Sequence, residues 1–175
     1  MPAKVQGALA LRKALKQFEP DLAKELSKEI ASFVKPIARN ARGFLPSNED
    51  APSGWLKRDN AKGKWATRYY DKGEASKGIT YKTTPSKKNS KGFRALASVM
   101  NKSAGGAIYE TAGRKSGITG NFTPRLSGEL KGRSQMSKGR AIFRAFEDDH
   151  GKATAGVLKA IEAAAAKLNS TKGKI

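Results

Sequence analysis

One apolar stripe limits the possible folds of this chain more than any other feature. It runs from Asp21 to Ala41 with apolar side chains at steps of three and four, namely Leu22, Leu26, Ile30, Phe33, Val34, Ile37 and Ala41. That spacing places them on one face of an α-helix. Pro20 suits the first turn of such a helix, Gly43 favours a stop after it, and Pro36 is expected to kink its last turns. We therefore predict a helix over residues 21–41.

Two further helices are predicted near the ends of the chain. Residues 5–18 present a shorter apolar stripe, and Pro20 separates it from the helix that follows. Residues 149–168 repeat the same spacing and contain an alanine run that favours helix. The acidic side chains of Glu147, Asp148 and Asp149 stand where the N-terminal cap of this last helix is expected. His150 is expected in its first turn.

Between the helices, the pattern changes to short segments compatible with a period of two. Residues 79–84, 93–100 and 107–111 read as strands bounded by turn residues, and residues 141–146 as a fourth extended piece. Gly105 and Gly106 are expected to make a tight reversal between strands. The order of elements predicts an α+β fold, with long N- and C-terminal helices packed on a small antiparallel sheet of three to four strands.

A length of 175 residues predicts a single domain over residues 1–175. Within it we expect N-terminal helices over 1–56, an extended basic loop or arm over 57–94, strands and turns over 95–146, a C-terminal helix over 147–168 and a flexible tail over 169–175. The longest apolar run is too short to cross a bilayer. We therefore expect a soluble protein without a membrane partner.

Charge is the second strong constraint. The chain has 35 Lys and Arg against 15 Asp and Glu, a formal net charge of +20. Nearly half of the excess lies in residues 57–94, which hold 12 basic and 3 acidic side chains. A chain with this balance is attracted to nucleic acids and to acidic protein surfaces.

Aromatic side chains are interleaved with the cations of this basic stretch. The candidate docking residues are Trp55, Lys57, Arg58, Lys62, Lys64, Trp65, Arg68, Tyr69, Tyr70, Lys87, Lys88 and Lys91. Aromatic rings can stack on bases while cations contact phosphates. Trp, Tyr and Arg are also the usual anchors of protein interfaces. The pattern therefore leaves protein docking and nucleic-acid binding open with equal weight.

The inventory of reactive side chains argues against catalysis. The absence of Cys and the single His150 exclude thiolate metal sites, a cysteine nucleophile and any pair of imidazoles. Neighbouring carboxylates at residues 49–50 and 147–149 suit a divalent cation in principle, but helix capping explains the second group. Gly106 and Gly113 lack the spacing of a phosphate-binding loop. We expect no enzyme activity, no cofactor and no metal.

Residues 104–113 show an alternating pattern, bounded by glycines, that a simple run of charged residues does not have. Read as a strand, it places Glu110 on one face and Tyr109 on the other. Glu110 is the only acidic residue between positions 75 and 128, so we expect it to pair with an arginine of the surrounding basic surface. Tyr109, Glu110 and Gly113 are the candidates for an inter-subunit or strand-end motif.

The order of these motifs resembles a known family over roughly residues 20–168. The motifs are a long helix with Val34, Ile37, Ala38 and Arg42, then Leu45-Pro46, Ser53-Gly54-Trp55-Leu56, Ala107–Gly113, Arg140–Phe146 and a C-terminal helix. In this order the chain resembles the tail-completion or neck proteins of long-tailed bacteriophages. The basic insert at 57–94 is longer than in that family, and Gly139–Phe143 replaces its proline-phenylalanine step.

The resemblance implies a virion structural protein at the head–tail junction, with a neck, connector, tail-completion or tail-terminator role. It also implies a homo-oligomeric ring of about six copies around the DNA channel. Its partners would be other head–tail joining proteins and the tail tube, with non-specific contact to the genomic DNA, after synthesis in the host cytoplasm. The alternative is a nucleic-acid-binding protein of architectural or ribosome-associated type.

Overall fold

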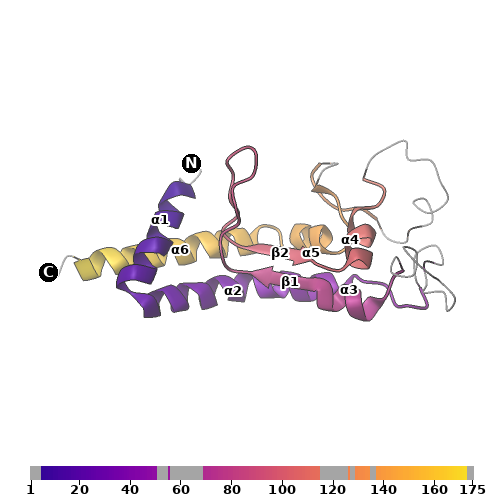
Figure 1. The fold of residues 1–175 in the computed structure, drawn as a ribbon, viewed down its shortest axis with the longest axis horizontal. Helices are drawn as coiled ribbons and strands as arrows, with labels where there is room; N and C mark the ends of the chain where they lie inside the picture. The colour runs from indigo at the N-terminus through magenta and orange to yellow at the C-terminus, as the bar shows by residue number, and fades with distance from the viewer. Residues whose placement is uncertain are drawn as a thin grey trace. The chain divides into compact units, whose positions relative to one another are not determined.

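The computed structural model describes residues 5–50, 55, 69–114, 126, 129–134 and 137–172. Within them the chain forms six α-helices and a two-stranded antiparallel sheet (Figure 1). They divide into two compact units: unit 1 is Met1–Pro36, Tyr81–Ser98 and Gly151–Ile175, and unit 2 is Ile37–Thr80 and Val99–His150. The single domain remains a prediction, because each unit draws on separated stretches of the chain.

Three helices make up most of unit 1. α1 is Val5–Phe18, α2 is Pro20–Gly43 and α6 is Lys152–Lys172. Both predicted N-terminal helices are confirmed, and α2 continues through Pro36, after which its residues belong to unit 2. α1 packs against α6. The buried apolar side chains of this unit are Leu15, Leu26, Ile30, Val34, Ala153, Val157, Ala160, Ala164 and Leu168.

The predicted C-terminal helix is confirmed, but its expected N-terminal cap is wrong. Glu147 and Asp148 end a separate helix, α5 (Ile142–Asp148), and Asp149 is the C-cap of that helix. His150 is not in the first turn of α6, because it has a φ of 51° and Gly151 has a φ of 81°. Two consecutive left-handed residues end one helix and reorient the chain before the next begins.

The sheet has two strands within the described residues, β1 (Ile79–Lys82) and β2 (Ser98–Asn101). They overlap the predicted strands at 79–84 and 93–100. The predicted strand at 107–111 is wrong, because this segment belongs to helix α4 (Ala104–Thr111), and the extended piece at 141–146 is wrong, because α5 occupies it. The sheet of three to four strands is therefore not found in this part of the chain.

Local capping explains why α4 is a helix. Ser103 has an extended backbone, and its hydroxyl accepts a hydrogen bond from the backbone N–H of Gly106 at 3.0 Å. This is the N-cap arrangement that starts a helix. Gly105 and Gly106 thus lie in the first turn of α4, and the tight reversal expected there is wrong. A Cβ at Gly106 would collide with the side chain of Asn101, so glycine permits this close approach.

Unit 2 also contains α3 (Lys72–Gly78), inside the stretch where the sequence predicted a loop or arm. Its N-cap is Asp71, whose carboxylate accepts from the N–H of Glu74 at 2.7 Å. α3 packs against α4. The buried apolar side chains of this unit are Ile37, Ala38, Ala41, Leu45, Tyr70, Ala75, Ile79, Tyr109, Leu126, Ala141 and Ala145.

Candidate functional site

Residues 83–97 connect β1 to β2 and form what we call the basic hairpin, which lies in unit 1 (Figure 1). Its two limbs are joined by a hydrogen bond from the N–H of Ser86 to the carbonyl of Ala95 at 2.8 Å, and by one from Asn89 to Phe93 at 2.9 Å. At the tip, the side-chain oxygen of Asn89 accepts from the N–H groups of Lys91 and Phe93. Gly92 supplies a φ of 75°. The hairpin is therefore organised by its own turn chemistry.

The basic hairpin presents cations and one aromatic ring to solvent. Lys87, Lys88 and Lys91 are exposed, and Phe93 retains 60% of its accessible surface. Residues 83–97 contain no carboxylate, so these charges are not neutralised within the segment. An exposed group of cations beside a large apolar ring is suited to an acidic protein surface or to phosphates.

The remaining candidate docking residues fall into two groups. Lys57, Arg58, Lys62, Lys64, Trp65 and Arg68 lie outside the described residues. The other three, Trp55, Tyr69 and Tyr70, are in unit 2.

Tyr70 is a core residue with 2% of its surface exposed. Its hydroxyl donates to the carbonyl of Pro46 at 2.9 Å, and its ring centroid lies 6.0 Å from that of Trp55 and 6.0 Å from that of Tyr109. Burial raises the pKa of the Tyr70 phenol, and the neighbouring Tyr109 and Asp71 act in the same direction. The backbone N–H of Tyr70 also donates to the carbonyl of Trp55 at 3.0 Å, so Tyr70 holds Trp55 by its ring and its backbone.

Glu110 has a structural partner set that the sequence did not indicate. Its carboxylate accepts from three consecutive backbone N–H groups, those of Ala141 at 2.7 Å, Ile142 at 3.1 Å and Phe143 at 2.9 Å. These are the free donors at the start of α5, whose own N-cap residue makes no side-chain cap. A carboxylate placed there also complements the positive end of the helix. Gly139 leaves room for it, because a Cβ at that position would collide with the carboxylate.

Arg140 pairs with free backbone carbonyls at the end of α4, as Glu110 does with free N–H groups at the start of α5. One of its terminal nitrogens donates to the carbonyl of Tyr109 at 3.0 Å and to that of Ala112 at 2.7 Å. Its guanidinium carbon lies 5.9 Å from the centroid of the Tyr109 ring. Burial lowers the pKa of Arg140, while the neighbouring Tyr109 and Glu110 act to raise it. Glu110 and Arg140 are thus two buried charges that each hold backbone groups, and the expected pairing of Glu110 with an arginine stays a prediction.

Two more arginines of unit 2 lie over aromatic rings. The guanidinium of Arg144 is 4.2 Å from the ring centroid of Phe44, and that of Arg114 is 4.6 Å from the ring centroid of Phe143. Arg114 also donates to the carbonyl of Lys138. Gly113, with a φ of 82°, makes the turn that leads from α4 to Arg114. The predicted motif of Tyr109, Glu110 and Gly113 is therefore part of the internal bracing of this unit.

Comparison with known proteins adds no relative. No protein-family model, curated protein or solved structure matches this chain. Among the residues described, no group of three His, Cys, Asp or Glu side chains is placed to hold a metal ion. None of the helices in the described ranges is long and apolar enough to cross a membrane.

Proposed function

We propose that this chain is a structural subunit of the head–tail junction of a long-tailed bacteriophage, in a neck, tail-completion or tail-terminator role. Its work is docking, with several copies, about six, arranged as a ring around the DNA channel. The order of motifs along the sequence supports the family, and the basic hairpin is the observation that carries the docking role. Other head–tail joining proteins and the tail tube are its partners.

The basic hairpin is built for an interface. Its limbs and its Asn89 turn are satisfied by internal hydrogen bonds, so partner binding does not have to order it from a random coil. Its exposed lysines favour encounter with an acidic surface, and Phe93 offers an apolar anchor. The lysine charges speed the encounter with the partner and fix the register of the complex, while the aromatic ring of Phe93 supplies apolar surface to bury.

Unit 2, taken by itself, is internally braced. Glu110 and Arg140 tie α4 to α5 through five hydrogen bonds to backbone groups. A subunit whose helices are held in this way keeps its shape when a neighbour is added. Rigid elements of this kind are the usual support for binding sites.

Nucleic-acid binding is the alternative, favoured by the same lysines and by the net charge of +20. In that case the chain binds DNA or RNA as an isolated monomer with a steep loss of affinity as salt rises. Its affinity for duplex DNA then falls when the hairpin lysines are removed, and the salt dependence weakens by about one slope unit per lost phosphate contact.

One triple variant distinguishes the two functions. We expect Lys87→Glu/Lys88→Glu/Lys91→Glu to weaken binding to the purified tail-tube and joining proteins by at least about tenfold, measured by biolayer interferometry. The matched control is Lys28→Glu/Lys35→Glu/Lys159→Glu, which makes the same charge change at exposed helix positions. Equal losses in both triple variants would show a general charge effect and contradict a docking hairpin.

A further inference from the structure

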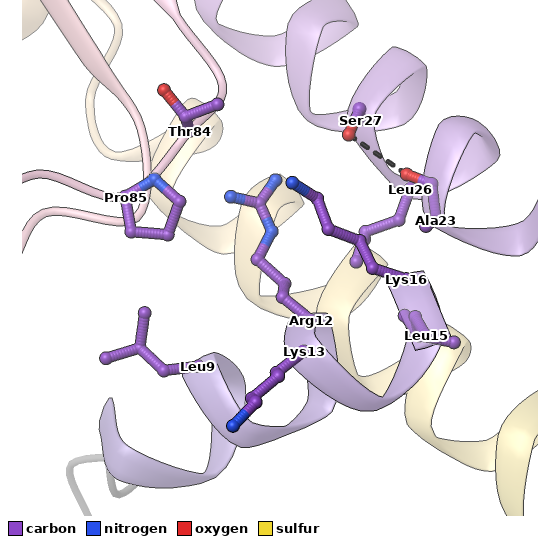
Figure 2. Close-up of a pocket in the computed structure, with 10 residues that line it drawn as sticks. All are labelled: Leu9, Arg12, Lys13, Leu15, Lys16, Ala23, Leu26, Ser27, Thr84 and Pro85. Atoms are coloured by element: carbon purple, nitrogen blue, oxygen red, sulfur yellow. Dashed lines mark hydrogen bonds between the residues drawn. The ribbon is translucent and has the colours of Figure 1, made fainter. Parts of the chain in front are cut away.

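Unit 1 contains a pocket that the docking role of the hairpin does not use. It has a volume of about 260 Å³ and lies among α1, α2 and the first residues of the basic hairpin. Figure 2 shows the ten residues that line it. Its apolar lining comes from Leu9, Leu15, Ala23, Leu26 and Pro85. A side chain of leucine or phenylalanine type finds an apolar environment there.

The charges of this pocket have one sign. Arg12 and Lys16 extend to the same side of it, toward Thr84 and Ser27, whereas the ammonium group of Lys13 points away from them (Figure 2). No carboxylate is among the lining residues. Arg12 donates to the carbonyl of Leu96 at 3.4 Å, and burial lowers the pKa of its guanidinium. The pocket therefore suits an apolar group that carries an anion beside it.

Unit 2 contains a segment with that chemistry. Phe146 in α5 is 47% exposed and is followed by Glu147, Asp148 and Asp149. Of the other exposed large apolar residues in the described ranges, Tyr81, Phe93 and Leu158 are each followed by a cation, and Phe18 is followed by the single acid Glu19 before Pro20. Asp149 comes three residues after Phe146 and keeps a helical backbone, so the two occupy neighbouring positions on one face.

We infer that the pocket of one copy receives Phe146 of a second copy, with the carboxylate of Asp149 beside Arg12 and Lys16. The inference names the contact between neighbours in the proposed ring and rests on that proposal. In the proposed ring each copy offers its pocket to one neighbour and Phe146 to the other, so the contact is heterologous, and its repetition generates a closed ring or a filament. In this contact Phe146 supplies the apolar surface that is buried, and Asp149 fixes the register of one copy against the next.

Self-association of the purified full chain tests this contact. By analytical ultracentrifugation in about 0.15 M salt, we expect Phe146→Ala and Lys16→Glu each to weaken association by about tenfold or more. Lys28→Glu is the matched control, because it makes the same charge change at an exposed position of unit 1 that does not line the pocket. We expect Asp149→Lys to weaken association as well. Its control is Glu49→Lys, which makes the same charge change at an exposed acid elsewhere in unit 2. Unchanged association of Phe146→Ala or Lys16→Glu would overturn the inference.

Two combinations show that the contact joins different copies. A chain with Lys16→Glu and Asp149→Lys together is expected to regain the association that each single change loses. A mixture of Lys16→Glu chains with Phe146→Ala chains is expected to give heterodimers that grow no further, because each copy retains one working surface. Failure of the mixture to associate would overturn the inference, since each copy still offers the surface that the other one needs.

Folding is monitored by circular dichroism in every variant, and Phe146→Ala alters an exposed side chain, so it keeps the test valid if a pocket variant unfolds. If the wild-type chain forms rings and all variants do so equally, the pocket contact is wrong and the ring of the proposed function stands. If the wild-type chain stays monomeric with its partner proteins present, the proposed ring fails as well.

Discussion

Glu110 and Arg140 are the two buried charged residues among those described, with 5% of each exposed. Removing charges from water is unfavourable unless hydrogen bonds replace the lost hydration. Here the replacement comes from the backbone, since Glu110 meets the free N–H groups of α5 and Arg140 the last carbonyls of α4. Each charge thus satisfies groups that the helix ends leave unpaired.

Glu110→Gln tests this account of the carboxylate. The amide offers one acceptor oxygen and places N–H donors against the backbone N–H groups of α5, so we expect unfolding free energy to fall by about 3 kcal/mol. The measurement is urea denaturation followed by circular dichroism, with the exposed Glu162→Gln as control. A loss no larger than that of the control would contradict the capping role.

The buried phenols predict a loss of stability in alkali. Burial raises the pKa of Tyr70 and of Tyr109 above the ordinary value, so the unfolded state loses these protons first. Their contribution is complete below about pH 10 and declines as the pH rises from there toward the raised values. We expect the stability difference between wild type and Tyr70→Phe to shrink above about pH 10, measured as urea midpoints. The exposed Tyr81→Phe serves as control, and a constant difference would contradict the assignment.

At the scale of elements, close approach decides where glycine is required. Gly156 lies within α6, and a Cβ there would collide with the ring of Phe33 in α2. The same two helices are joined at their surface by an ion pair between Lys167 and Glu25 at 2.7 Å. Gly7 in α1 is different, because nothing lies within 4 Å of the position a Cβ would take.

Gly156→Ala and Gly7→Ala are therefore expected to change stability in opposite directions. Alanine favours helix by about 1 kcal/mol at either position, but overpacking against Phe33 costs about 1–3 kcal/mol. We expect Gly156→Ala to lower the melting temperature and Gly7→Ala to raise it, measured by calorimetry. In a Phe33→Ala background, Gly156→Ala should become stabilising. A stabilising Gly156→Ala in the native background would contradict the packing of α6 on α2.

The sequence predicted the long helices and missed the short ones, for a physical reason. A stripe of seven apolar residues in α2 has a clear helical period, whereas Ala107–Thr111 is too short to distinguish a period of two from one of 3.6. Capping contacts decide such a segment: the local Ser103 cap for α4, and the Glu110 carboxylate, a tertiary contact, for α5. Ser103, directly before this segment, was a weak N-cap signal, without the Glu or Gln three residues later that would strengthen it.

The candidate site was predictable only in part, as the fold was. The exposed lysines of the basic hairpin follow from composition, because a stretch with few apolar residues and high charge remains at the surface. Tyr70 was named for docking but is 2% exposed. The role of Arg140 depends on two helices that meet only in the fold, so no local pattern could have indicated it.

At the scale of the whole molecule, the excess of positive charge bears on how copies could assemble. A net charge of +20 favours solubility and opposes close packing of copies, so assembly needs neutralising surfaces. In the proposed function the basic hairpin meets such surfaces on other proteins, and the proposed pocket contact pairs one copy's cations with the next copy's carboxylates. Together they describe a subunit that joins a particle rather than acting alone.

The most direct measurement is electron microscopy of lysates from a bacteriophage whose gene for this chain has been deleted. Loss of the joining subunit predicts filled heads and complete tails that remain separate. The wild-type gene is expected to restore joined particles, and the gene with Lys87→Glu/Lys88→Glu/Lys91→Glu is not. Joined, infectious particles in the absence of the gene would contradict a role at the head–tail junction.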